Sequence, residues 1–250
     1  MKKAVLSIIA VAVLLGCSKI PFAPETNGRV KYVSALYYEE EDGDAFTVRY
    51  TWNRLGQILS FSIPEMDIQS SFSWSSSLQM TFNYNHIVIA GRGEISGGNL
   101  VELQLSNQDS GYYNHTRANY DGDGHPEKLI LTNQYGDETS NQFVWFDGNC
   151  TLIRDSSGGE IRITYGDNID NAGIGAHLLP FFLGNMDLFY LPFTFNIISK
   201  NLPVKITYMD DSDYDEVRIT YLKDDDGNVS RATLTRYDDG PFSSWMDFTY

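Results

Sequence analysis

The closest approach to a metal-binding motif lies between Asn119 and Ile130. Asn119, Asp121 and Asp123 alternate ahead of Gly124, as oxygen ligands do in the first half of a calcium-binding loop. The twelfth position of such a loop requires a bidentate carboxylate, and Ile130 occupies it. We therefore predict a hairpin turn here, no metal site and no cofactor.

The other residue types that carry catalysis lack the spacing they need. The histidines are His86, His115, His125 and His177. No two of them have the His-x-x-x-His spacing of a helical zinc site. Ser96 misses the Gly-x-Ser-x-Gly pattern of a nucleophile elbow by register. A carboxylate pair for glycoside hydrolysis is defined by geometry, so spacing among 33 acidic residues identifies none.

Aromatic side chains offer the best argument for a ligand. Trp52, Trp74, Trp145 and Trp245 could act as stacking platforms for sugars. Aromatic residues are also favoured in β-strands, where they pack against cross-strand neighbours. Both interpretations stay open from the sequence.

Cys17 has the most specific chemical setting. Lys2 and Lys3 precede an apolar run over residues 4–15, as in an export signal. A helix of that run spans roughly 18 Å, too short for the ~30 Å hydrocarbon core. Its end, Leu14-Leu15-Gly16-Cys17, resembles the lipobox of bacterial lipoproteins.

The lipobox resemblance implies that the chain is cut before Cys17 and that this thiol carries lipid. Residues 1–16 are then the signal peptide. Residues 17–27, with Pro21 and Pro24, read as a lipidated tether. Three acyl chains hold a protein at a membrane far more durably than one. We expect a bacterial envelope protein, lipid-anchored at the outer membrane, with its periplasmic or surface face undecided.

Charge restricts the partners. The formal net charge is −15, and loss of Lys2 and Lys3 moves it to −17. A polyanion without a basic cluster repels phosphate backbones, so we expect no nucleic-acid partner. Cys150 is the second of two cysteines; with Cys17 lipidated it has no disulfide partner, and a small buried residue is expected.

From residue 28 to residue 250 the dominant pattern is a period of two. Examples are Val48/Tyr50/Trp52, Leu78/Met80/Phe82/Tyr84, Val101/Leu103/Leu105, Ile161/Ile163/Tyr165, Val217/Ile219/Tyr221 and Met246/Phe248/Tyr250. Such alternation predicts strands with one apolar and one polar face. Short Asp/Asn/Gly turns join them, so neighbours must be antiparallel. We predict a single all-β domain, a large antiparallel meander forming a barrel-like or strongly curved sheet.

The stretch 172–198 breaks this pattern. It is rich in Phe and Leu, but Gly173, Gly175, Pro180, Gly184 and Pro192 interrupt it, so a continuous spanning helix is not expected. Two alternatives stand. It packs on or into the sheet and fills the interior, or it lines a pocket for an apolar or carbohydrate ligand.

The lipobox, the Tyr/Asp/Gly hairpins, the segment 198–203 leading into Lys205-Ile206-Thr207-Tyr208 and the closing hairpin 221–250 resemble an uncharacterised family of bacterial envelope lipoproteins. The resemblance implies a porin-like β fold and transfers no catalytic residue. A strong anchor signal without catalytic spacing favours a non-enzymatic binding or accessory module with a glycan or envelope protein as ligand. The alternatives are a glycan-directed hydrolase and a structural partner of an outer-membrane complex.

Overall fold

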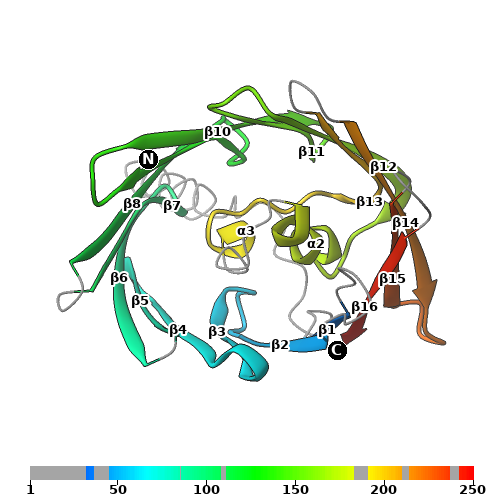
Figure 1. Ribbon diagram of the computed structural model, residues 1–250, viewed down its shortest axis with the longest axis horizontal. Coiled ribbons are helices and arrows are strands. Elements are labelled where there is room, and N and C mark those ends of the chain that lie inside the picture. Colours follow the sequence, from blue (N-terminus) through cyan, green and yellow to red (C-terminus); the bar gives the residue numbers. More distant parts are fainter. Residues whose placement is uncertain are drawn as a thin grey trace, which may run out of the picture.

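The computed structural model shows an antiparallel barrel in which each strand pairs with its neighbours in sequence (Figure 1). It describes residues 32–36, 45–84, 86–107, 111–182, 191–209, 214–236 and 242–250. The predicted signal peptide, Cys17 and the tether lie outside these residues. β1 pairs with both β2 and β16, so the first strand meets the last and the sheet closes on itself.

The strands are β1 Tyr32–Leu36, β2 Ala45–Trp52, β3 Ile58–Ile63, β4 Ile68–Trp74, β5 Ser77–Tyr84, β6 Ile87–Ser96, β7 Asn99–Asn107, β8 Tyr112–Tyr120, β9 Pro126–Asn133, β10 Glu138–Phe146, β11 Asn149–Asp155, β12 Glu160–Ile169, β13 Asn201–Met209, β14 Tyr214–Lys223, β15 Val229–Arg236 and β16 Phe242–Thr249. A 3₁₀ turn, Pro64–Met66, joins β3 to β4. The helices α2 (Ile174–Phe182) and α3 (Leu191–Thr194) lie between β12 and β13 in sequence.

The predicted alternation sets the register of the barrel. Leu78, Met80 and Phe82 of β5 are buried, whereas Gln79 between them is exposed. The all-β antiparallel meander is therefore confirmed. One predicted position shifts: a bulge between β6 and β7 moves Val101 out of the apolar row, and Leu100 is buried in its place.

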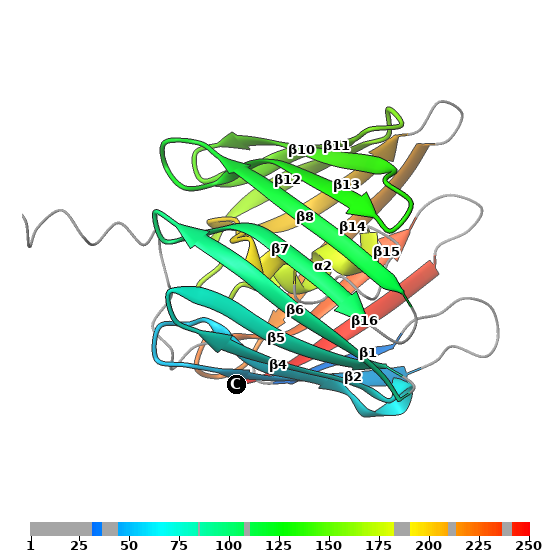
Figure 2. The same cartoon turned by 90° about the vertical axis from the view of Figure 1, so that its left-hand side faces the viewer.

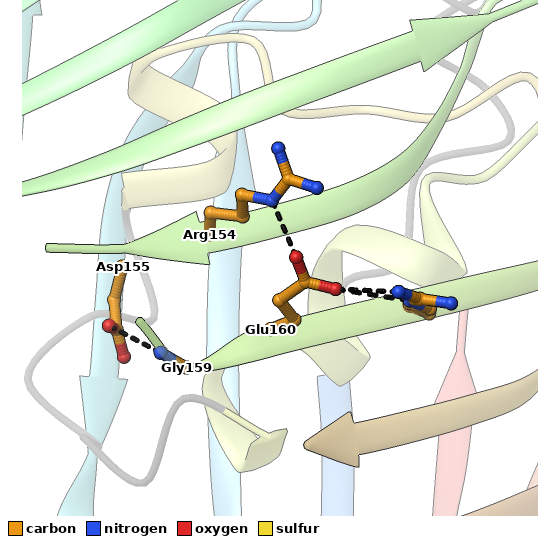
Figure 3. Close-up of polar contacts among 5 residues, drawn as sticks. Arg154, Asp155, Gly159 and Glu160 are labelled. Atoms are coloured by element: carbon orange, nitrogen blue, oxygen red, sulfur yellow. Dashed lines mark hydrogen bonds and ion pairs between the residues drawn. The ribbon is translucent and has the colours of Figure 1, made fainter. Parts of the chain in front are cut away.

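Several hairpins share one five-residue turn, (Asn/Asp)-x-x-Gly-x. The copies begin at Asn53, Asp121, Asn133, Asp155 and Asp224. Figure 3 shows one copy, in which Oδ1 of Asp155 accepts a hydrogen bond from the backbone N–H of Gly159 (3.0 Å). The same oxygen also accepts one from the backbone N–H of Ser157 (2.8 Å). Gly158 has a φ of 104°, a conformation that a side chain disfavours. The short polar side chain and the glycine together fix the hairpin.

The helices lie inside the barrel (Figure 1). Ile174, Ala176, Leu178 and Leu179 of α2 are all buried, and a helix that is apolar on every side must be enclosed. Phe195 and Ile197, which follow α3, are buried as well. The prediction that 172–198 packs into the sheet is confirmed for residues 172–179 and 192–198, where burial is described. No helix among the described residues is long and apolar enough to cross a membrane.

Candidate functional site

The four predicted tryptophans do not share one face of the barrel. Trp52, Trp74 and Trp145 pack against the interior core. Trp245 lies in the outward-facing row of β16, with the guanidinium of Arg231 5.5 Å from its ring centre. A role for these residues in ligand binding stays a prediction.

Trp74 and Trp145 belong to a repeated contact, which we call the aromatic clasp. An aromatic side chain near the end of one strand donates a hydrogen bond to a backbone carbonyl near the start of the preceding strand. The pairs are Trp74 to Ile58 (2.7 Å), Tyr120 to Leu100 (2.7 Å), Trp145 to Pro126 (2.8 Å), Tyr165 to Cys150 (2.7 Å), Tyr221 to Pro203 (2.5 Å) and Tyr250 to Val229 (3.0 Å). Buried aromatic rings with one polar atom need such a partner, so the clasps are structural.

All the clasps lie at one end of the barrel, which we call the termini end. There Tyr32 of β1 lies beside Thr249 of β16, and the C-terminus is marked at this end in Figure 2. The chain passes from β12 to α2 at the same end. The N-terminal segment that carries Cys17 therefore joins the barrel at the termini end.

Asp170 holds the start of α2 where it enters the barrel. Its carboxylate accepts hydrogen bonds from the backbone N–H of Ile174 (2.8 Å) and Gly175 (2.7 Å). Asp170 is buried; burial raises the pKa of its carboxyl to about 6, although the backbone N–H groups favour the charged form. The charge state of Asp170 therefore bears on how the start of α2 is held.

His177 of α2 lies deep in the interior among aromatic rings. Its ring centre is 4.8 Å from that of Tyr50 and 4.6 Å from that of Phe193. Burial raises the pKa of Tyr50 well above its ordinary value. The space next to α2 is thus packed with side chains, as expected for an interior that is filled.

The calcium-like stretch forms a hairpin turn, as predicted. Oδ1 of Asp121 accepts hydrogen bonds from the backbone N–H of Asp123 and His125 (both 2.9 Å). The ligand atoms of these three residues lie within 4.8 Å of one another, and the His125 ring stacks on Trp145 at 4.5 Å. Exposed acidic groups are common in turns without an ion, so this cluster is assigned to the turn.

Cys150 is free and buried, and burial raises the pKa of its thiol to about 12. A reactive cysteine requires a lowered pKa and access to solvent. The interpretation of Cys150 as a small packing residue agrees with this environment.

The outward face carries charged side chains in pairs over one part of the barrel. In Figure 3, Glu160 of β12 accepts hydrogen bonds from Arg154 (2.6 Å) and Arg162 (2.8 Å). These donors, Arg162 first, lower the pKa of Glu160. Arg231 and Asp247 form a two-bond pair between β15 and β16. Within the described part of the chain, every ion pair found lies on or between β7 and β16.

The opposite part of the outward face is hollowed. A depression of 630 Å³ crosses β4, β5 and β6, lined by Ser71, Ser73, Gln79, Thr81, Ala90 and Arg92. A second depression of 540 Å³ crosses β5, β6 and β7, lined by Ser76, Ser77, Glu94, Glu102 and Gln104, and it shares Arg92 with the first. We call the two together the outer groove. Both depressions are shallow and open to solvent.

Two glycines of β6, Gly91 and Gly93, belong to the lining of the outer groove. A Cβ on Gly91 would lie 2.2 Å from Cγ of Met80 and 2.8 Å from Cδ2 of Leu105. A Cβ on Gly93 would lie 2.5 Å from Cδ1 of Leu100. Side chains of the two neighbouring strands thus close over the inner side of β6. A side chain at either position would have to displace these neighbours or the strand itself.

Sequence reasoning missed the outer groove. The polar row of β5 was visible as the alternate face of a strand, but such rows are ordinary on any half-buried sheet. The usable signal was Gly91 and Gly93 at inward positions of one strand, where apolar side chains are expected.

Solved structures with this arrangement exist. A porin-like protein from Bacteroides uniformis ATCC 8492 superimposes with a TM-score of 0.69 at 12% identity, covering 90% of this chain and 97% of that one. A porin-like protein from Bacteroides vulgatus ATCC 8482 gives a TM-score of 0.59 at 15% identity, covering 89% and 98%. This chain has a porin-like fold. No family model matches it, and no curated protein matches it.

Proposed function

We propose that the protein is a lipid-anchored envelope barrel with a filled interior that acts as a binding or accessory module through its outer surface. The lipid on Cys17 holds it at the outer membrane, and residues 1–16 are removed as the signal peptide. Between Cys17 and Tyr32 the extended chain reaches roughly 50 Å. The termini end of the barrel would therefore face the membrane, at a distance of up to that length.

The observation that carries this proposal is the polarity of the two faces. Inward side chains such as Phe61, Leu103 and Ile206 are apolar and buried, whereas Arg154, Glu160 and Arg162 form their ion pairs on the outside. A barrel that spans a bilayer has the reverse arrangement. One Arg or Lys facing lipid at the midplane costs about 2–4 kcal/mol, which supports a barrel outside the hydrocarbon.

Fractionation of the Cys17→Ala variant tests the anchor. We expect the wild-type chain in the membrane fraction with incorporated palmitate, and the variant in the wash without it. A Cys150→Ala variant serves as control and should keep both the palmitate and the membrane location. Because an uncleaved signal peptide would itself hold the chain in a membrane, the variant is produced behind a cleavable export signal without a lipobox. Retention of that processed chain in the membrane after a carbonate wash would contradict the proposal.

Conductance tests the filled interior separately. We expect the wild-type protein added to planar bilayers to produce no channel currents, since α2 and α3 occupy the barrel. Stepwise currents that depend on protein concentration would mean that the interior opens.

One observation supports a glycan-directed hydrolase as the second candidate. Glu94 and Glu102 are directly opposite each other on β6 and β7 and line the same depression, and glycoside hydrolysis uses a carboxylate pair. The test is release of reducing sugar from a glycan. If the wild type releases it and Glu102→Gln does not, the protein is a hydrolase and not a binding module. A structural partner of an outer-membrane complex is the third candidate; stoichiometric co-purification with one envelope protein would favour it.

A further inference from the structure

We propose that the outer groove binds a neutral polysaccharide that lies across β4, β5, β6 and β7. This inference rests on the proposed function, because it requires an outward face exposed to water. It names the ligand class of a surface binding module and assigns it to a defined set of strands.

The lining of the groove is suited to sugar hydroxyls. Gln79, Arg92 and Gln104 stand in one cross-strand row, with Gln79 opposite Arg92 and Arg92 opposite Gln104. The two amides each donate and accept hydrogen bonds, and the guanidinium donates in a fixed fork. Adjacent strands are about 4.8 Å apart, comparable to one sugar ring. A chain of sugars crossing the strands would therefore meet one such side chain per residue.

Glu94 and Glu102 supply acceptors in the same groove. The two residues are directly opposite each other on neighbouring strands, so one hydroxyl-rich ligand can reach both carboxylates. Nε2 of Gln104 (2.5 Å) and Nε2 of His115 (3.1 Å) contact Oε1 of Glu102. Sugar hydroxyls placed between the two carboxylates would donate to both.

Charge favours neutral sugars over acidic polymers as ligands of the groove. The chain carries a net charge of −15, and the two glutamates stand within the groove itself. Acidic polysaccharides and nucleic acids are repelled by such a field. At the edge of the same face, Tyr113 pairs in register with Ser106 and is 38% exposed, which offers a ring for stacking.

Affinity electrophoresis tests the inference with the lipidated full chain in detergent micelles. The probes are gels containing amylopectin, galactomannan, xyloglucan or mixed-linkage β-glucan, with polygalacturonate as the charged comparison. We expect retardation by at least one neutral polymer and none by polygalacturonate. Thr81→Trp fills the groove from an outward position and should weaken binding at least tenfold, as should the double variant Gln79→Ala/Gln104→Ala.

Thr220→Trp is the matched control, because Thr220 is an exposed, outward threonine on β14, away from the groove. It should be retarded like the wild type. Equal retardation of Thr81→Trp and Thr220→Trp would overturn the assignment to the groove, and so would an absence of retardation by all four neutral polymers. In either case, a protein that is still membrane-bound through Cys17 and non-conducting would leave the proposed anchor and filled interior standing.

Discussion

Replacing Asp170 with Asn should change how the stability of the barrel depends on pH. The carboxyl has an ordinary pKa of 3.8, which burial raises to about 6 in the folded protein. A difference of about two pKa units corresponds to about 3 kcal/mol between the two protonation states. Asn keeps one oxygen to accept the N–H of Ile174 and cannot ionise.

The direction follows from proton binding. Between pH 4 and 6 the folded protein holds the Asp170 proton more tightly than the unfolded chain does, so stability falls as pH rises. The contribution is fully present below the unfolded pKa and is lost as pH rises through the folded value. Tyr165, Tyr221 and Tyr250 lie close enough to act on the same charge, but burial raises the pKa of each above its ordinary value. They stay neutral throughout this window.

The assay is urea unfolding of the wild type and Asp170→Asn at several pH values between 3.5 and 7.5. The difference in free energy of unfolding between the two proteins should shift by about 3 kcal/mol against the wild type over that range. The other carboxylates titrate in both proteins, so their contributions to the free energy of unfolding cancel in this difference. Asp167→Asn controls for the loss of one negative charge. Parallel curves for the wild type and Asp170→Asn would refute the argument, because a carboxylate buried at the start of α2 must show its ionisation.

Three further predictions follow from single contacts. Tyr165→Phe removes hydrogen bonds to the carbonyl of Cys150 and to Oγ of Ser199, both 2.7 Å, and should lower the free energy of unfolding by about 1–3 kcal/mol in urea. Gly91→Ala forces a Cβ against Met80 and should lower it by about 1–3 kcal/mol. The Cys150 thiol, with a pKa raised to about 12, should react with a thiol reagent in the native protein only at the rate of unfolding.

Each of these has a control on the same chain. Tyr135 is 79% exposed, so Tyr135→Phe should leave stability unchanged; an equal loss in both tyrosine variants would contradict the clasp argument. A Cβ on Gly122 would meet nothing within 4 Å, so Gly122→Ala should be tolerated. Thiol labelling of the native protein as fast as in urea would show that Cys150 is accessible.

The strands and turns were predictable because their causes are local. Alternation such as Leu78, Gln79, Met80 fixes which face each residue takes, and turns such as 155–159 carry their own hydrogen-bond acceptor and glycine. The bulge that exchanges Val101 for Leu100 was not predictable. It depends on how β6 and β7 pair, and a one-residue shift leaves the apolar pattern almost unchanged.

The Tyr/Asp/Gly hairpins could be recognised in the sequence, but the contacts made by their tyrosines could not. Tyr120 and Tyr221 precede acidic turns, but the carbonyls they contact belong to Leu100 and Pro203, in the preceding hairpin. To predict a contact between successive hairpins, one must know how far one hairpin is shifted along the barrel relative to the next. The sequence of a single hairpin does not specify that shift.

The sequence by itself determined an antiparallel meander of half-buried strands, its turns and an apolar segment that had to be enclosed, since backbone sterics and side-chain polarity act over a few residues. Only the tertiary structure decided that β1 meets β16, that Asp170 starts the helix filling the barrel, and that Met80 and Leu105 occupy the space beside Gly91. These three features depend on contacts between residues that are far apart in the chain. In such contacts, the space that one side chain leaves determines where another strand can lie.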